Sequence, residues 1–227
     1  MAQNKYYVVV DLEFAKVRGL MKNKFGRGTE IIQLGAVLLD HTYAIVRKFN
    51  SYVTPCYARL DEEIRKLTGI RERQLAGSPN ILAVLDRFAE WLPDDADITC
   101  VEWSNSDREQ LDHEIEFHNY RNVKLAAAME NWVDCQAMFG EFMNHSEKPY
   151  SLQEALSATV LENPDMKDHD GLSDAYNTSL LFAGIMSKKL KINDYYKHLT
   201  AVSSSSDSSE SGCTLGDLFA NLLNQVA

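Results

Sequence analysis

The sequence has few cysteines and no long apolar run, and both absences limit what the protein can be. Its four cysteines lie far apart, without the Cys-x-x-Cys spacing of a zinc or redox site: Cys56, Cys100, Cys135 and Cys213. We therefore expect reduced thiols, which are typical of a cytoplasmic protein, and no disulfide framework. No window reaches the length of a membrane-spanning helix, and the N-terminal residues lack the apolar stretch of a signal peptide.

Positive charge is also scarce, since 23 basic residues face 33 acidic ones and the net charge is −10. Such a chain does not coat long nucleic acid by neutralising phosphates. An enzyme that grips a few nucleotides through bound metal remains compatible with this charge. The length of 227 residues and the hydrophobic fraction of 45% fit one large domain, or one domain plus a tail.

The most apolar strand-like stretch lies near the N-terminus and contains two acids. Residues 6–14 are rich in aromatic and β-branched types, a pattern typical of a strand buried on both faces. Asp11 and Glu13 are two residues apart and therefore point to the same face of such a strand. Buried acids repel each other, and Mg²⁺ or Mn²⁺ is the simplest compensation. Alternatively, the strand ends at Val10 and exposes both acids in a turn.

A basic loop follows this acidic pair. Residues 15–28 contain no acid but five cations: Lys16, Arg18, Lys22, Lys24 and Arg27. The segment is either an ordinary solvated loop or a rim that steers phosphates towards the acids. The second interpretation makes Lys22, Lys24 and Arg27 candidates for substrate binding.

Two neighbours of the loop are further candidates for contact with a nucleotide. Phe14 directly follows the acidic pair, so its ring or backbone either touches the terminal nucleotide or packs in the core. Glu30 begins the next strand and is a candidate for the border of the nucleotide pocket.

The rest of the first 200 residues alternates between strand and helix patterns, which favours α/β layers. Further strands are predicted at residues 30–40, 43–53, 97–103 and 131–135. Because the second and third strands form a hairpin, we expect a mixed sheet. Helical patterns occur at residues 61–67, 78–92, 104–120, 135–144, 152–159 and 171–190.

The C-terminal end has a different character. We predict one domain over residues 1–200, followed by a serine-rich linker at 201–212. Residues 213–227 carry apolar positions at helical spacing, which predicts an amphipathic helix. We expect this helix to dock on the parent domain or on a protein partner, because an isolated helix of this length is marginal in water.

Three later residues bear on the acidic pair. Asp107 follows the fourth predicted strand, Asp174 lies in the first turns of the last long helix, and His169 precedes Asp174 by five residues. Taken singly, each has an ordinary explanation: a helix cap, a surface acid and a loop histidine.

Taken together, these residues form a recognisable order. Asp-x-Glu on the first strand, Asp after the fourth strand and His-x-x-x-x-Asp before the last helix resemble the DEDD exonuclease family, histidine branch. The residues at 11–14, 30–36, 67–70 and 169–175 agree with this resemblance, which covers about residues 5–190. They look most like the branch of three-prime-end exoribonucleases and sporulation-inhibitor-type proteins. Gly171 and Ser173 depart from the commoner family text without removing a ligand.

The resemblance implies a ribonuclease H-like fold, with three α/β/α layers around a five-stranded mixed sheet. It implies removal of nucleotides one at a time from the 3′ end of a nucleic acid. The family's metal-binding acids match Asp11, Glu13, Asp107 and Asp174, and its general base matches His169. Two divalent ions, Mg²⁺ or Mn²⁺, are the expected cofactors.

Three functions follow from these patterns. The first is a metal-dependent 3′-to-5′ exonuclease acting on single-stranded nucleic acid, with RNA expected as the substrate. The second is the same chemistry on DNA, in proofreading or repair. The third is a nucleic-acid-binding module without turnover, and the presence of all five catalytic positions argues against it.

Overall fold

A computed structural model describes residues 4–144, 149–162, 164–165, 167, 169–194 and 196–197. The chain divides into two units, Met1–Lys191 and Ile192–Ala227, and the elements that bear on function lie in the first. The linker predicted at 201–212 and the helix predicted at 213–227 lie outside the described residues. Within the described part, every helix is too short or too polar to span a membrane.

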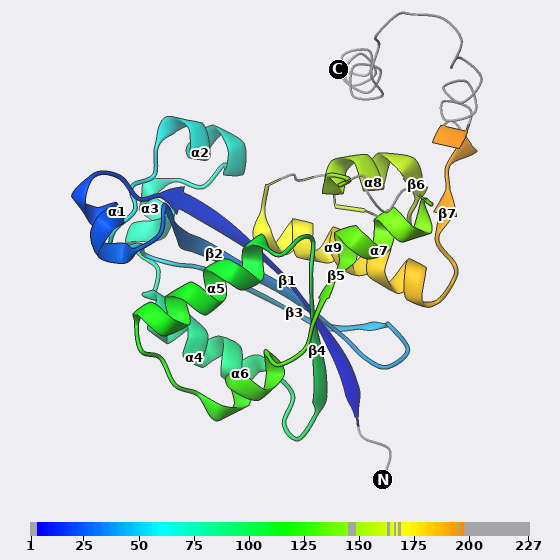
Figure 1. Cartoon of the computed structure of the whole chain (residues 1–227), viewed down its shortest axis with the longest axis horizontal. Helices are drawn as coiled ribbons and strands as arrows, with labels where there is room; N and C mark the ends of the chain where they lie inside the picture. Colours follow the sequence, from blue (N-terminus) through cyan, green and yellow to red (C-terminus); the bar gives the residue numbers. More distant parts are fainter. Residues whose placement is uncertain are drawn as a thin grey trace, which may run out of the picture. The chain divides into compact units, whose positions relative to one another are not determined.

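The acidic strand lies at the centre of a five-stranded sheet of order β3-β2-β1-β4-β5 (Figure 1). Strand β1 (Lys5–Lys16) pairs antiparallel with β2 (Thr29–Leu39), which pairs antiparallel with β3 (Ile45–Tyr52). On its other side, β1 runs parallel to β4 (Asp97–Glu102), and β4 runs parallel to β5 (Trp132–Asp134). The predicted mixed sheet is confirmed.

The helices begin mostly where a polar side chain accepts a backbone N–H. Asp61, Asn80, Asn122, Asp134, Ser151 and Asp170 all act as such caps. The helices are α1 (Leu20–Phe25), α2 (Glu62–Thr68), α3 (Glu72–Ala76), α4 (Ile81–Trp91), α5 (Ser106–Phe117), α6 (Val123–Ala128), α7 (Cys135–Phe142), α8 (Leu152–Ala158) and α9 (Gly171–Met186). The short strands β6 (Thr159–Val160) and β7 (Lys191–Ile192) complete the described elements.

Helices α1, α3 and α6 were not predicted from the sequence. Each has at most six residues, and a helix this short is not stable by itself in water. Helix α1 occupies the segment predicted as a basic loop. It ends at Gly26, whose left-handed backbone (φ 79°) suits glycine.

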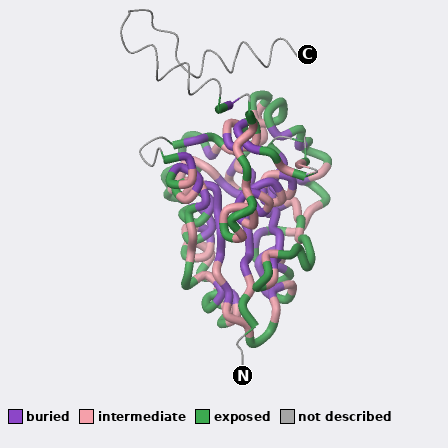
Figure 2. Tube along the Cα trace, turned by 90° about the vertical axis from the view of Figure 1, so that its right-hand side faces the viewer, coloured by how far each residue is buried: buried purple, intermediate pink, exposed green. Residues whose placement is uncertain are grey.

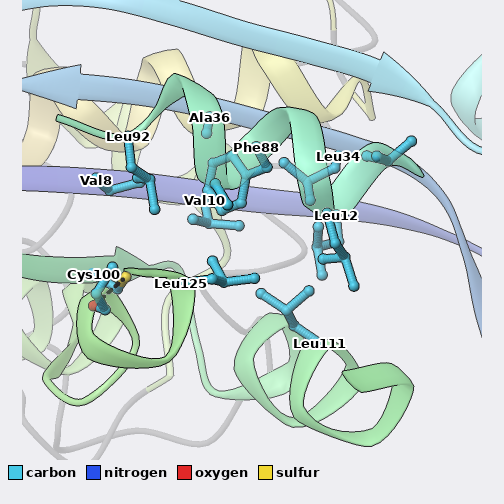
Figure 3. Close-up of a cluster of buried hydrophobic side chains, with 14 of the residues drawn as sticks. Val8, Val10, Leu12, Leu34, Ala36, Phe88, Leu92, Cys100, Leu111 and Leu125 are labelled. Carbon is cyan, nitrogen blue, oxygen red and sulfur yellow. Dashed lines mark hydrogen bonds between the residues drawn. The ribbon is translucent and has the colours of Figure 1, made fainter. Parts of the chain in front are cut away.

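One apolar core fills the space between the sheet and the layer that contains α4, α5 and α6. Figure 3 shows Val8, Val10 and Leu12 of β1 facing side chains of these helices, among them Phe88, Leu111 and Leu125. Helix α9 crosses β1 and β2 on the other face, so the sheet lies between two helical layers. Figure 2 shows buried residues along the strands and exposed residues on the outer helices. Because successive side chains of a strand point to opposite faces of the sheet, alternate residues of β1 face different helical layers.

A buried acid ties α5 to β2. The Glu114 side chain is 0% exposed, and its Oε1 accepts the N–H of Ile31 at 2.6 Å and the amide of Gln110 at 3.1 Å. Its Oε2 has no hydrogen-bond partner within the described residues and lies 4.0 Å from Nε2 of His118. Burial raises the pKa of Glu114 from 4.5 to about 7, although the N–H of Ile31 opposes the shift.

This shift predicts that Glu114→Gln makes the protein less sensitive to pH. The folded protein binds the Glu114 proton more tightly than the unfolded chain, so stability falls as pH rises from 4.5 through about 7. The free energy of unfolding of the variant, minus that of the wild type, should increase by roughly 2 kcal/mol between about pH 5 and pH 8. Urea denaturation measures this difference. The exposed Glu116→Gln on the same helix is the control, and equal pH profiles for the two variants would contradict the assignment.

The N-terminus of α9 lies directly on the backbone of β2. A Cβ added at Gly35 would be 2.1 Å from the carbonyl carbon of Gly171. No side chain larger than hydrogen fits between the strand and the helix at this point. This contact matters because α9 carries Asp174, with His169 just before it.

We therefore predict that Gly35→Ala lowers the free energy of unfolding by about 3 kcal/mol, since backbone must move to admit the methyl group. Thermal unfolding measures the loss. Gly77→Ala is the matched control, because its Cβ would meet only the carbonyl of Arg73 at 3.8 Å, and we expect a change below about 1 kcal/mol. Similar melting temperatures for the two variants would show that β2 and α9 separate easily.

Candidate active site

Strand β1 continues through both of its acids and does not end at Val10. Asp11 and Glu13 pair with Gly35 and Gln33 of β2, and a bulge follows between Glu13 and Phe14. Glu13 is only 9% exposed and Asp11 is half-buried. Within the described residues, neither forms an ion pair with a lysine, arginine or histidine. Both acids therefore lie in a poorly solvated place without a partner cation.

The first turn of α5 adds a third carboxylate. Oδ1 of Asp107 accepts the N–H of Leu12 at 3.0 Å, which places this carboxylate beside the β1 backbone between Asp11 and Glu13. The N-cap of α5 is Asn105, so Asp107 is not the cap of the helix. Asp107 is 5% exposed.

The N-terminal end of α9 brings the last two predicted residues. Glu13, His169 and Asp174 each offer one ligand atom, and these atoms lie within 4.8 Å of one another. His169 is exposed and has a left-handed backbone conformation (φ 52°). Asp170 is the N-cap of α9, and its carboxylate accepts the N–H of Ser173 at 3.2 Å. This bond fixes the start of the helix, which lies between His169 and Asp174.

The electrostatics of the cluster follow from burial and mutual repulsion. Burial raises the pKa of Asp11 well above its ordinary value, and the charges of Asp107, Asp174 and Glu13 add to the shift. Burial likewise raises the pKa of Glu13 to about 8, and repulsion from the charges of Asp174 and Asp107 adds to this shift. Burial raises the pKa of Asp107 to about 7, although the hydrogen bond from the N–H of Leu12 opposes this shift.

Such a set of acids is unfavourable as anions unless a cation joins them. Carboxylate oxygens are the donors that Mg²⁺ and Mn²⁺ prefer. The donor chemistry of Asp11, Glu13, Asp107 and Asp174 therefore fits divalent cations, as does the burial of the first three without an ion pair within the described residues.

The sequence did not predict the role of Gln33, whose side chain fixes the start of α9 by a hydrogen bond. Gln33 is buried opposite Glu13, and its Oε1 accepts the N–H of Gly171 at 3.3 Å. Its Nε2 donates to Asn50 Oδ1 at 3.0 Å. One amide therefore links β2, β3 and the start of α9. The available signal was a polar residue inside an apolar strand.

Asp170 is a further acid beside the cluster, and it has its own cation. Its carboxylate pairs with the ammonium of Lys167. Burial alone would raise the pKa of Asp170, but Lys167 and the N–H of Ser173 outweigh this effect and lower it. Asp170 is thus anionic at neutral pH, and its charge adds to the raised pKa of Glu13.

Of the other predicted substrate residues, Glu30 and Phe14 make structural contacts, and their contact with a nucleotide stays a prediction. Glu30 is 3% exposed, and its two carboxylate oxygens accept the N–H groups of Cys56 at 2.6 Å and Tyr57 at 2.7 Å, and also that of Ala58. These bonds hold the segment after β3 against the start of β2. Phe14 is partly buried and packs on the apolar core.

The basic residues lie outside the carboxylate cluster. Arg18 pairs with Asp61 at 2.6 Å, Lys16 pairs with Glu63, and Arg27 is 3.4 Å from Glu109. Lys22 and Lys24 are exposed on α1 and form no ion pair within the described residues. Three of the five cations therefore pair with a carboxylate, and the other two form no ion pair among the described residues.

A mixed sheet between helical layers, with acids and a histidine converging from β1, α5 and α9, defines a ribonuclease H-like nuclease domain. The profile of the Exonuclease family matches residues 8–182, and the chain belongs to this family. The predicted resemblance to DEDD-type 3′-to-5′ exonucleases is confirmed.

Two curated relatives illustrate the breadth of the family. The chain is 30% identical over 203 residues to ERI1 exoribonuclease 2 of Danio rerio, covering 80% of this chain and 35% of that protein. It is 30% identical over 194 residues to DNA polymerase III subunit epsilon of Aquifex aeolicus (strain VF5), covering 84% of this chain and 86% of that one. The chain thus spans about a third of the length of the first relative.

Solved structures share the fold. A 3′-exonuclease that recognises the 3′ end of a histone mRNA stem-loop superposes with a TM-score of 0.64 at 19% identity, covering 85% of this chain and 87% of that chain. Exonuclease I of E. coli, in a complex with single-stranded DNA, gives 0.62 at 15% identity, covering 88% and 43%. At these identities the likeness concerns the fold.

The converging acids predict that divalent cations stabilise the protein through Glu13. Mg²⁺ or Mn²⁺ in hundredfold excess over its dissociation constant should add about 2.7 kcal/mol to the wild-type free energy of unfolding. In Glu13→Gln most of this gain should disappear, while the metal-free variant should be at least as stable as the metal-free wild type, because the cost of burying a titratable carboxyl among other acids is gone. Melting temperatures with and without metal test both statements. The exposed Glu141→Gln should respond like the wild type, and an undiminished metal effect in Glu13→Gln would remove Glu13 from the ligands.

Proposed function

We propose that the protein hydrolyses single-stranded nucleic acid from its 3′ end, one nucleotide at a time. The observation that carries this proposal is the meeting of Glu13, His169 and Asp174 within 4.8 Å, beside Asp11 and Asp107. RNA is the expected substrate, because the sequence resembles the exoribonuclease branch. DNA is the alternative, and the similarity to a DNA polymerase III epsilon subunit supports it.

The roles follow from the positions. Asp11, Glu13, Asp107 and Asp174 would hold two Mg²⁺ or Mn²⁺ ions. When bound, these ions activate the attacking water and stabilise the leaving 3′ oxygen. The exposed imidazole of His169 would accept the proton of that water, since histidine changes charge near neutral pH.

The surrounding residues would support these roles. Gln33 and Asp170 fix the start of α9 and thereby the positions of His169 and Asp174. Lys22, Lys24 and Arg27 would contact phosphates outside the metal site. From the sequence alone, we also propose that residues 213–227 dock on the parent domain or on a protein partner.

The direct test uses RNA and DNA single strands of equal sequence, each labelled at its 5′ end. The proposal expects products that shorten by one nucleotide at a time, with Mn²⁺ or Mg²⁺ and not with a chelator. The faster of the two strands identifies the substrate class. Asp174→Asn is the inactive control. Binding of either strand without any product would favour a non-catalytic module instead.

His169→Ala should lower kcat by about 10²–10⁴-fold. KM and the metal-induced rise in melting temperature should stay close to those of the wild type, because a base acts in the chemical step rather than in ground-state binding. Single-turnover rates with saturating enzyme measure the effect. The exposed His41→Ala serves as the matched control, and a wild-type rate in His169→Ala would exclude His169 as the base.

A further inference from the structure

Helix α1 exposes two neighbouring apolar side chains. Leu20 is 81% exposed and Met21 is 45% exposed. Every residue of this helix except Phe25 is exposed. Adjacent exposed apolar side chains on an ordered element need a reason, whereas single scattered ones do not.

The helix is fixed in place. Phe25 is fully buried, and its ring centroid lies 5.2 Å from that of Tyr57 and 4.8 Å from those of His113 and Phe117. At the base of the segment, Val17 donates its N–H to the carbonyl of Gly28 at 2.9 Å. Leu20 and Met21 are therefore held outward by a buried anchor on the same helix.

The charges on α1 show what kind of partner fits. Lys22 and Lys24 follow the apolar pair and form no ion pair within the described residues, although Lys24 lies 5.5 Å from the ring centroid of Tyr57. Apolar groups directly followed by cations match a single strand, whose unpaired bases offer apolar faces and whose phosphates offer charge. A protein partner fits less well, because lysine is depleted in the cores of protein interfaces.

The location links α1 to the acids. The segment continues directly from β1, which carries Asp11 and Glu13. At its far end, Arg27 bonds the side chain and the carbonyl of Glu109, both at 3.4 Å, two residues after Asp107. A strand whose 3′ end lies at the acids can therefore continue towards α1.

We propose that α1 binds the substrate strand upstream of its 3′-terminal nucleotide, with unpaired bases against Leu20 and Met21 and phosphates beside Lys22 and Lys24. This inference rests on the proposed exonuclease function and names the surface that would hold the upstream part of its substrate. Bases in a duplex are stacked inside and unavailable to α1, so the surface selects single strands.

The test compares a long single strand, the same strand with abasic sites in its upstream part, and a dinucleotide. For Leu20→Ser/Met21→Ser, the KM for the long strand, divided by the KM for the dinucleotide, should rise about fivefold, equivalent to roughly 1 kcal/mol. The wild type should show a similar loss on the abasic strand, and the double variant should show no further loss there. Val123→Ser, at a side chain 89% exposed on α6, is the control and should leave the ratio unchanged.

A second pair of variants separates the phosphate contacts from the base contacts. Lys22→Gln/Lys24→Gln should flatten the dependence of KM on salt and keep the penalty for abasic sites. Lys188→Gln/Lys189→Gln, exposed lysines after α9, should keep the wild-type salt slope. An unchanged KM ratio in Leu20→Ser/Met21→Ser would overturn the inference, as would a change in its state of association with no effect on KM. Turnover of the long single strand by the wild type reports on the proposed function separately, since its absence would refute the exonuclease itself.

Discussion

The structure depends on a group of carboxylates that the fold buries together on β1, where poor solvation and mutual repulsion both oppose their charges. Asp11 and Glu13 come from one strand, Asp107 reaches the same place through the N–H of Leu12, and Asp174 arrives on α9. Burial raises the pKa of Glu13 to about 8, so the metal-free site costs free energy at neutral pH. Divalent cations bound among these acids would remove the repulsion, which supports the proposal that the site holds them.

The rest of the framework keeps these groups from moving apart. The absence of a side chain at Gly35 lets α9 lie on β2, and the Gln33 amide bonds the first N–H of that helix. On the opposite layer, Glu114 fastens α5 to β2. These polar groups are buried between the layers of the sheet and helices, where an unsatisfied partner is costly. The positions of the acids are therefore fixed by contacts that take no part in the chemistry.

If it acts on a polyanion as proposed, this acidic protein needs local features that outweigh its net charge of −10. In the proposed function, bound cations would supply this at the carboxylates. Away from them, we propose that the lysines of α1 combine with Leu20 and Met21, so that attraction for bases would add to attraction for phosphates. The affinity of such a surface for a nucleic acid depends less on salt concentration than the affinity of a purely basic surface would.

The sequence by itself determined the strands, the longer helices, the order of the acids and the family, because these depend on local periodicity and on short motifs. The apolar pattern left open whether β1 ends at Val10, and the structure shows that the strand continues through Asp11 and Glu13. Tertiary structure alone decided which cations near α1 are neutralised, since Asp61, Glu63 and Glu109 are distant in the chain from their partners. It also decided that Glu30 binds backbone amides at Cys56 and Tyr57, and that the loop forms a helix around Phe25. A buried contact between distant residues has no periodic signature in the sequence, and burial is what gives Gln33, Glu30 and Phe25 their roles.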